Sequence, residues 1–209
     1  MLADHPEAFL AYLGAFAVAF VTGIAFHEFS HAWAANALGD DTAARQGRLT
    51  LNPLAHLDPV GTLLLLLVGF GWGKPTPVDP FRLRNGVKRG NMMVAAAGPL
   101  SNFAFAVLAS FPLMIGIVDV PNLGYGGGAD SGMLLGAFLF LVAWINIVLG
   151  IFNLIPIHPL DGFKVVLGVL PDELALPLAR ASRWGPALLL ALVALSFLRP
   201  ELSPLSWIF

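Results

Sequence analysis

The sequence predicts an all-α polytopic membrane protein with about four transmembrane helices, one re-entrant or interfacial segment and a small interfacial β element. Of its 209 residues, 57% are hydrophobic and only 11% are charged, whereas soluble domains carry about 25% charged residues. The mean hydropathy is +0.80. The apolar residues are gathered into runs, and a bilayer core about 30 Å thick requires about 20 of them per helix.

Four apolar runs are candidates for helices that cross the bilayer. They cover residues 8–38, 91–118, 132–156 and 184–198. The fourth run is short, but Trp184 at its start and Arg199 after its end suit the two interfaces of a membrane. The stretch "GTLLLLLVGFGWG", residues 61–73, has about ten strongly apolar residues between glycines. Because it is too short to cross, we expect it to be re-entrant or interfacial.

The positions of the basic residues favour the same topology. If residues 61–73 turn back without crossing, the loops 39–60, 74–90 and 157–183 share one side of the membrane. These loops contain ten of the eleven Lys and Arg residues. Because basic loops face the cytoplasm, the sequence predicts cytoplasmic basic loops, with the N-terminus and the acidic, glycine-rich loop 119–130 outside.

Two stretches between the runs predict the small β element at the cytoplasmic interface. Residues 45–52, "RQGRLTLN", alternate polar and apolar side chains, and residues 75–81, "PTPVDPF", are held extended by prolines. No repeat or linker divides the chain, so we expect residues 1–209 to form one domain. Each stretch outside the runs has fewer than about thirty residues, which leaves no room for a peptide-binding module.

Charge and cysteine content exclude several kinds of function. The net charge is −2, so no basic surface recruits nucleic acid. The chain contains no cysteine, which removes disulfides, thiolate metal ligands and cysteine nucleophiles together. The partner that the composition predicts is the lipid bilayer.

Ionisable residues stand inside the first apolar run, in "FHEFSHAWAA", residues 26–35. His27, Glu28 and His31 form the pattern H-E-x-x-H. On a helix both imidazoles can reach one metal ion, with Glu28 beside the water that this ion carries. Two imidazoles favour zinc, which lowers the pKa of its water so that a carboxylate can take the proton. Such a site is suited to peptide hydrolysis.

The alternative interpretation is a chance match, or histidines satisfied within a helix core. It is weaker here because ionisable groups inside a membrane span are costly and by default indicate function. A zinc site also needs a third protein ligand. The candidates are Asp58, Asp79, Asp161, Asp172, Glu173, His56 and His158.

Asp161 stands out among these candidates because it follows an apolar run in "NLIPIHPLDG", residues 153–162. Pro156 and Pro159 break the helix, and Gly162 permits a turn. Broken backbone at membrane depth is tolerated where it is buried or lines a cavity. To reach the histidines, the chain after Pro156 must dip back into the bilayer. Spacing alone leaves open that Asp161 is simply a turn or helix-end aspartate.

Four motifs follow one another on successive apolar segments: "FHEFSHA", "NPLAHLDPVGT", "AGPLSN" and "NLIPIHPLDG". In this order they resemble the site-2 family of intramembrane metalloproteases, of the short bacterial and archaeal type without a PDZ or CBS domain. The resemblance covers about residues 16–164, the expected catalytic core. It implies a prokaryotic cell (inner) membrane and hydrolysis of peptide bonds within or near the transmembrane segment of a membrane-protein substrate.

The resemblance also implies the roles of individual residues. One Zn²⁺ per chain would be bound by His27, His31 and Asp161, with Glu28 as general base. Asn153 would lie near the active site, in contact with the substrate backbone or the developing oxyanion. The residues that correspond to the family's G-P-x-x-N helix, for whose glycine and proline simple packing is the favoured interpretation, are Gly98, Pro99 and Asn102.

Two positions depart from the family pattern. His158 stands where such sequences usually have proline, and Phe163 stands where a small residue is common. We interpret His158 as an interfacial histidine, with a supporting role near the metal or an extra ligand as alternatives. His56 lies in a stretch that commonly carries histidine in this subgroup, and we do not assign it as a ligand.

A helical substrate must unwind before its backbone can be attacked, and an edge strand at residues 48–52 could hold it by strand addition. Two other functions compete with proteolysis. A catalytically inactive membrane-binding relative is disfavoured by the intact Glu28. A metal-ion transporter is disfavoured because such proteins commonly contain paired repeats, which this chain lacks. No pattern indicates an oligomeric state.

Overall fold

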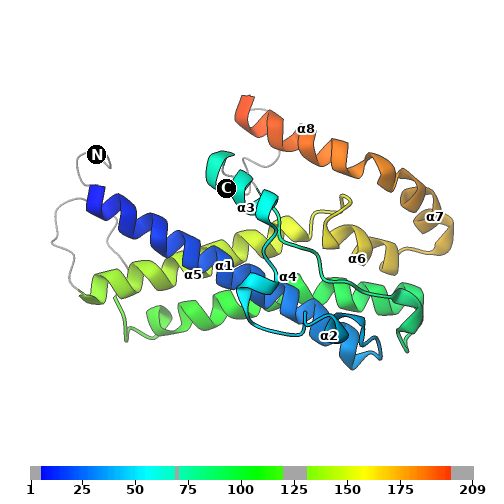
Figure 1. Cartoon of the computed structure of the whole chain (residues 1–209), viewed down its shortest axis with the longest axis horizontal. Helices are drawn as coiled ribbons and strands as arrows, with labels where there is room; N and C mark the ends of the chain where they lie inside the picture. Colours follow the sequence, from blue (N-terminus) through cyan, green and yellow to red (C-terminus); the bar gives the residue numbers. More distant parts are fainter. Residues whose placement is uncertain (1–5, 69–70, 120–130, 199–209) are drawn as a thin grey trace.

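A computed structural model of the chain describes residues 6–68, 71–119 and 131–198 (Figure 1). Within these ranges the structure is mostly helical, as predicted, and contains no strand. The α-helices are α1 (Pro6–Ala37), α2 (Thr42–Arg45), α3 (Pro59–Val68), α4 (Val87–Met114), α5 (Ser131–Asn153), α6 (Asp161–Val169), α7 (Asp172–Ala181) and α8 (Gly185–Leu198). Short 3-10 helices are η2 (Pro53–Ala55), η3 (Pro80–Arg82) and η4 (Ser182–Trp184).

Four of the described helical stretches are long and apolar enough to cross a membrane. They are Ala11–Ala37, Val87–Met114, Leu134–Asn153 and Asp172–Ser196. The fourth begins well before the predicted Trp184, because α7, η4 and α8 follow one another directly. α8 alone has 14 residues, or about 21 Å of helix, which is shorter than the hydrocarbon core. Most of the predicted outer loop, residues 120–130, lies outside the described residues, as does Arg199.

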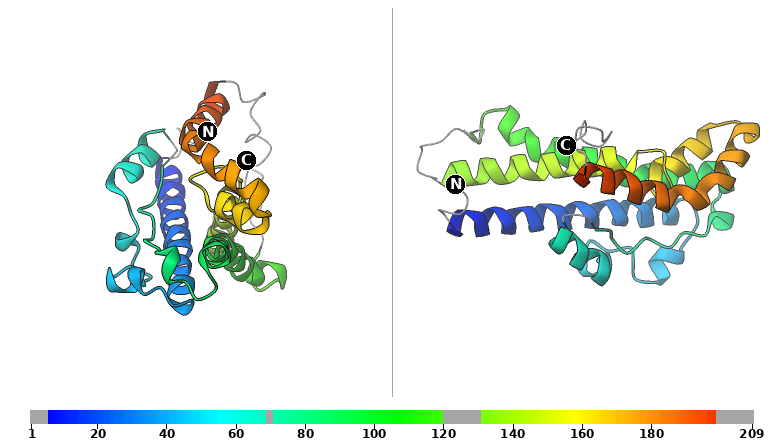
Figure 2. Two further views of the ribbon diagram at one scale, coloured as in Figure 1. Left: turned by 90° about the vertical axis from the view of Figure 1, so that its right-hand side faces the viewer. Right: turned by 90° about the horizontal axis from the view of Figure 1, so that it is seen from above.

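α1, α4 and α5 run side by side and form the centre of the molecule (Figures 1 and 2). Small side chains lie where they meet, since Ala19 of α1, Ala106 and Ala109 of α4 and Ala143 of α5 are buried in one cluster. Small residues let helices approach closely in a membrane, where packing holds them together. α6 packs against α4, which brings Asp161, the first residue of α6, beside this bundle.

The chain around α3 returns to the place where it started. Leu57 and Gly73 form an isolated antiparallel bridge, and the N–H of Lys74 donates to the carbonyl of His56 at 2.7 Å. Residues 69–70, which lie between α3 and this return, are outside the described part of the chain. The two ends of the predicted re-entrant or interfacial stretch therefore meet.

The predicted β element is wrong. Within residues 45–52, α2 ends at Arg45, Gly47 turns the chain with a φ of 69°, and Asn52 caps η2. Within residues 75–81, the prolines remove backbone donors and Asp79 caps η3. The alternating polarity of the first stretch thus reflects turns and caps, and the proposed edge strand at residues 48–52 is wrong with it.

A buried carboxylate ties the end of α1 to the chain that precedes α4. Asp40 is fully buried. One of its oxygens accepts from the N–H of Thr42 at 3.0 Å, and the other accepts from the N–H of Asp79 at 2.7 Å. Burial acts to raise the pKa of Asp40, but the hydrogen bonds from Thr42 and Asp79 outweigh it and lower that pKa below its ordinary value.

We expect Asp40→Asn to lower the free energy of unfolding by about 1–3 kcal/mol at neutral pH, because an amide cannot accept from both sides and leaves a buried donor unpaired. The depressed pKa means that ionised Asp40 stabilises the fold above its unfolded pKa of about 3.9 and loses this effect as the pH falls through the lower folded value. Denaturation followed by circular dichroism in detergent should therefore show the difference shrinking below about pH 4.

The control for this substitution is Asp172→Asn, because the Asp172 side chain is 75% exposed. Surface charge changes of this kind are expected to alter stability by less than about 0.5 kcal/mol. An Asp40→Asn deficit that persists unchanged into acid would contradict the assigned direction of the pKa.

Candidate metal centre

Within the described residues, one group of three His, Asp or Glu side chains is able to share a metal ion: His27, His31 and Asp161. The two histidines lie one turn apart on α1. Their Nε2 atoms are 3.0 Å apart, and Asp161 Oδ2 lies 3.0 Å from each. All three residues are buried, with no more than 7% of the surface exposed. The structure therefore brings together the three residues that the sequence singled out.

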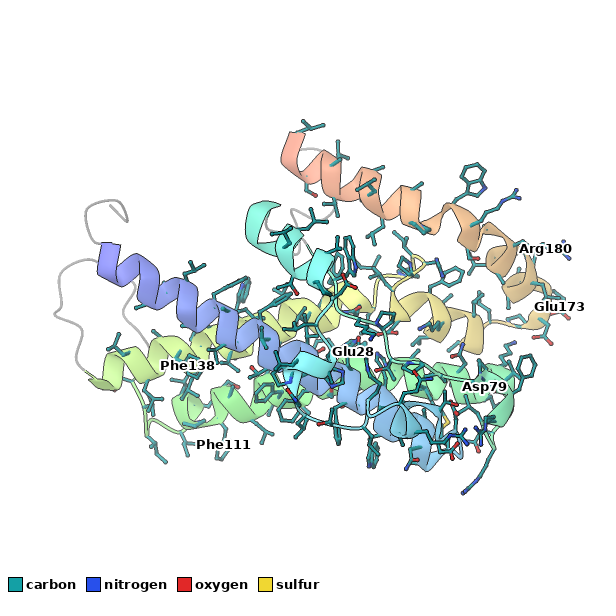
Figure 3. All side chains as sticks on the ribbon, in the orientation of Figure 1. Glu28, Asp79, Phe111, Phe138, Glu173 and Arg180 are labelled. Atoms are coloured by element: carbon teal, nitrogen blue, oxygen red, sulfur yellow. The ribbon has the colours of Figure 1, made fainter. Side chains whose placement is uncertain are left out.

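The acidic residues that competed for the third place have other partners or lie elsewhere. Asp58 and Asp79 accept hydrogen bonds from backbone N–H groups of their own turns, and Asp172 pairs with a lysine of α4. Figure 3 shows Asp79 and Glu173 well away from Glu28. None of these four belongs to the group of three.

His56 and His158 lie outside the group as well. His56 is fully buried, and its Nε2–H donates to the carbonyl of Thr50 at 2.7 Å, so it holds the loop that precedes α3. His158 packs edge-on against Phe163, with ring centroids 5.7 Å apart. The two departures from the family pattern therefore contact each other, and His158 is not part of the group of three.

A close approach of two backbones sets the position of Asp161. α5 ends at Asn153, and a series of turns leads into α6. A Cβ on Gly162 would lie 2.1 Å from the carbonyl oxygen of Leu154. The start of α6 can therefore lie against the end of α5 only because glycine follows the aspartate. This contact explains the D-G pair in the motif.

In each imidazole, Nδ1 is the nitrogen that faces away from the group of three, and its partner fixes it as a hydrogen-bond donor. His31 Nδ1 lies 2.7 Å from the carbonyl oxygen of Val94, which can only accept. His27 Nδ1 lies 2.6 Å from Oδ1 of Asn102. The amide nitrogen of Asn102 donates to the carbonyl of Gly23 at 3.1 Å, so the amide oxygen is the atom left to accept from His27. In the neutral imidazoles, both Nε2 atoms therefore carry lone pairs.

These two lone pairs and the Asp161 carboxylate meet at one point. Acceptor atoms 3.0 Å apart repel one another in a buried site unless positive charge lies between them. Outer N–H groups bound to a carbonyl or amide oxygen are typical of metal-ligating histidines. Two imidazole nitrogens and one carboxylate oxygen fit zinc and leave a fourth position for water. The residues present therefore fit a zinc ion.

Asp161 enters the group as a carboxylate, as metal ligation requires. Its Oδ2 is the atom that lies 3.0 Å from Nε2 of both histidines. The Nζ atom of Lys164 lies 3.5 Å from the other carboxylate oxygen and adds positive charge. Lys164 was not predicted as a site residue, since a single lysine in a basic loop gives no specific signal.

Glu28 is held beside the group by the extended chain between α3 and η3. Its Oε2 accepts from the N–H of Thr76 at 2.9 Å, and the Thr76 hydroxyl donates to the Glu28 carbonyl at 3.1 Å. Figure 3 shows Glu28 where this cyan stretch passes α1. Arg48 donates to the carbonyl of Lys74 and so holds the same stretch. Thr76 was not predicted, although the prolines on both sides make it the one backbone donor of "PTP".

A cavity of about 1360 Å³ opens beside these side chains. Its polar part is lined by His27, Glu28, His31, Asn153, Asp161 and Lys164. Its apolar wall, from α1, α5 and α8, includes Tyr12, Phe16, Phe20, Ile24, Trp144, Val148 and Leu189. An apolar cavity with a few convergent polar groups is typical of a binding or active site.

α4 lies directly against the histidines. A Cβ on Gly98 would lie 2.5 Å from His31 Nε2 and 2.6 Å from His27 Nε2, so only glycine fits there. The next residue, Pro99, is fully buried, as is Asn102. Gly98 and Pro99 thus lie closely packed inside the bundle, whereas Asn102 also bonds to His27.

Comparison with known proteins gives matches of one kind. The family model described as "Peptidase family M50" matches residues 113–192. "Putative zinc metalloprotease YwhC" of Bacillus subtilis (strain 168) is 36% identical over 183 residues, which cover 87% of this chain and 79% of the relative. "Putative zinc metalloprotease Rip2" of Mycobacterium tuberculosis (strain ATCC 25618 / H37Rv) is 30% identical over 206 residues, covering 96% and 73%. No solved structure matches the chain significantly.

We expect Gly98→Ala to abolish high-affinity zinc binding, because the added methyl group would overlap both imidazoles. Gly14→Ala is the matched control, since Gly14 lies on α1 with nothing within 4 Å of the added atom. Zinc per chain, measured by atomic emission on protein purified in detergent, should fall in the first variant and stay at the parent value in the second. Equal zinc content in both would contradict this geometry.

Proposed function

The chain belongs to peptidase family M50, the site-2 protease family, and we propose that it is a zinc-dependent endopeptidase that cleaves membrane-protein substrates within or near their transmembrane segments. The observation that carries the proposal is the meeting of His27, His31 and Asp161 at 3.0 Å, with Glu28 adjacent and an apolar cavity beside them. The relatives whose names state zinc metalloprotease support the same chemistry.

In this proposal His27, His31 and Asp161 hold one zinc ion per chain. Bound zinc would supply Lewis acidity and lower the pKa of a water molecule. Glu28 takes a proton from the attacking water and passes it to the nitrogen of the departing amine. The N–H of Thr76, bonded to Oε2, keeps the Glu28 carboxylate oriented while its other oxygen remains available for the proton.

The cavity supports the proposed substrate class. Aromatic and aliphatic side chains of α1, α5 and α8 form a wall suited to an apolar segment. A helical segment has its backbone groups bonded internally, so it must unwind before a peptide bond is exposed. Asn153 lines the cavity, and its amide uses one N–H on the carbonyl of Leu149. A side-chain amide carries two N–H groups, so the other one is able to donate to a substrate carbonyl.

The proposed orientation places the basic loops in the cytoplasm and the N-terminus outside. The meeting of Leu57 with Gly73 supports a stretch that turns back without crossing. The proposed location is the cell membrane of a prokaryote. The proposed partners are the bilayer and a transmembrane protein substrate, with no nucleic acid. The proposed unit is a single domain, with its catalytic core at about residues 16–164.

We expect Glu28→Gln to keep the zinc content of the parent and to lower the cleavage rate by at least about a hundredfold, because an amide cannot take the proton. Asp161→Ala should lose both zinc and cleavage. The assay uses the purified full chain with a panel of single-pass membrane proteins in detergent, and gel electrophoresis measures cleavage. Glu173→Gln makes the same chemical change at an exposed site and should cleave like the parent.

Three results would contradict the proposal. Full cleavage by Glu28→Gln would remove the general base, and full zinc binding by Asp161→Ala would remove the third ligand. A parent that binds zinc but cleaves none of the panel, and instead moves zinc across reconstituted vesicles, would favour transport.

The absence of cysteine from the chain makes the orientation testable by labelling. We expect a cysteine at Arg89, which is exposed near the start of α4, to resist a membrane-impermeant maleimide in intact cells and to react after lysis. A cysteine at position 2 should react in intact cells because the N-terminus is proposed to lie outside. The opposite pattern would reverse the topology.

A further inference from the structure

Besides Asn102, a second polar side chain is buried where α1, α4 and α5 meet. Asn146 lies on α5 within the candidate span Leu134–Asn153 and is fully buried. A buried amide in a membrane span is costly unless its donors and acceptor are paired. The peptidase chemistry proposed above does not use Asn146, so its presence requires a separate explanation.

The hydrogen bonds of Asn146 connect it to the metal centre. Its amide nitrogen donates to the carbonyl of Val142 at 2.9 Å, within its own helix. This bond assigns the other amide atom as oxygen, because two facing oxygens would repel. That oxygen accepts from the amide nitrogen of Asn102 on α4 at 2.8 Å. Asn102 in turn accepts from Nδ1 of His27 on α1 at 2.6 Å.

We propose that Asn146 is a positioning residue for the metal centre, acting through Asn102 to keep the lone pair of His27 Nε2 directed at the metal. The Asn102 amide has two N–H groups, and its two acceptors are Asn146 Oδ1 and the carbonyl of Gly23. With both paired, the amide oxygen can only face His27. The order of bonds runs from α5 through α4 to α1, so three helices fix one tautomer.

The fit of α1 around Asn146 supports this role. A Cβ on Gly23 would lie 3.1 Å from Asn146 Oδ1 and 3.3 Å from its Nδ2. Glycine at this position therefore lets the Asn146 amide lie flush against α1. The same glycine supplies the second carbonyl that Asn102 needs, so one point on α1 accommodates Asn146 and orients Asn102.

The expected size of the effect follows from the number of bonds lost. Removing an outer partner of a metal-bound histidine lowers metal affinity about 10-fold to 100-fold, which is the effect expected of Asn102→Leu. Asn146→Leu removes one of the two acceptors that hold Asn102 and leaves Gly23 in place. We expect it to weaken zinc binding about fivefold, the worth of one net hydrogen bond.

The test is a double-mutant cycle on zinc affinity. The parent, Asn146→Leu, Asn102→Leu and the double variant are purified as full chains in detergent, and zinc dissociation constants are measured by competition with a chromogenic chelator. If Asn146 acts through Asn102, the fivefold effect disappears in the Asn102→Leu background. Independent effects that multiply, or zinc binding by Asn146→Leu equal to the parent's, would overturn the proposal.

Two further variants separate positioning from packing. Asn146→Ala lacks the acceptor and leaves a void, whereas Asn146→Leu lacks it and keeps the volume. The two should therefore share the loss of zinc affinity while differing in thermal stability. Val142→Ala loosens the buried core of α5 but keeps the carbonyl that Asn146 uses. It should lower stability and leave the zinc dissociation constant unchanged, and a fivefold loss there would assign the effect to packing.

This inference rests on the zinc site of the proposed function, and the experiment distinguishes their failures. A parent chain that binds no zinc would overturn the proposed function itself. A parent that binds zinc with an Asn146→Leu variant that binds it equally well would overturn the positioning role alone. Because the readout is metal affinity, neither result depends on finding a substrate.

Discussion

Two imidazole nitrogens and a carboxylate oxygen meet 3.0 Å from one another in a buried site, and most of the surrounding structure serves to keep them there. Such a group is stable only with positive charge at its centre. Its atoms must also be held from outside, because nothing in the apolar surroundings would otherwise orient them. Val94 and Asn102 do this for the two histidines, and both lie on α4. The close contact of α4 with α1 is therefore a requirement of the site as well as of the bundle.

The same requirement explains why glycine stands at three close contacts. Gly98 lets α4 touch the imidazoles, Gly162 lets α6 begin against the end of α5, and Gly23 lets the Asn146 amide lie against α1. At each of these positions the absence of a side chain lets a neighbouring group approach the backbone closely, so that a polar group can reach its partner. The glycines and the polar residues thus form one arrangement: Gly98 lies against the histidines themselves, whereas Gly162 and Gly23 lie against groups that position Asp161 and Asn102.

The sequence predicted the parts of this arrangement that depend on local spacing. His27 and His31 follow from a one-turn separation on a helix. Broken backbone after an apolar run singled out Asp161 without deciding its role, and the family resemblance implied it as the third ligand. Thr76 and Asn146 were not predicted, because each contacts the site across a long separation in the chain and has no motif of its own. The prediction of a β element was wrong for a local reason, because the alternation of polar and apolar side chains near Gly47 and Asn52 came from a turn and a helix cap.

The contact between His158 and Phe163 illustrates how two departures from a pattern can be one change. Each position alone appeared anomalous, and His158 beside a candidate ligand suggested a role at the metal. In the structure the rings pack edge-on, and a Cβ on Gly185 would meet the His158 Cβ at 2.7 Å. The histidine is therefore enclosed between α6 and the start of α8. Because Phe163 lies two residues after Asp161, the contact of His158 with Phe163 and with the start of α8 is packing that joins α8 to the part of the chain that carries Asp161.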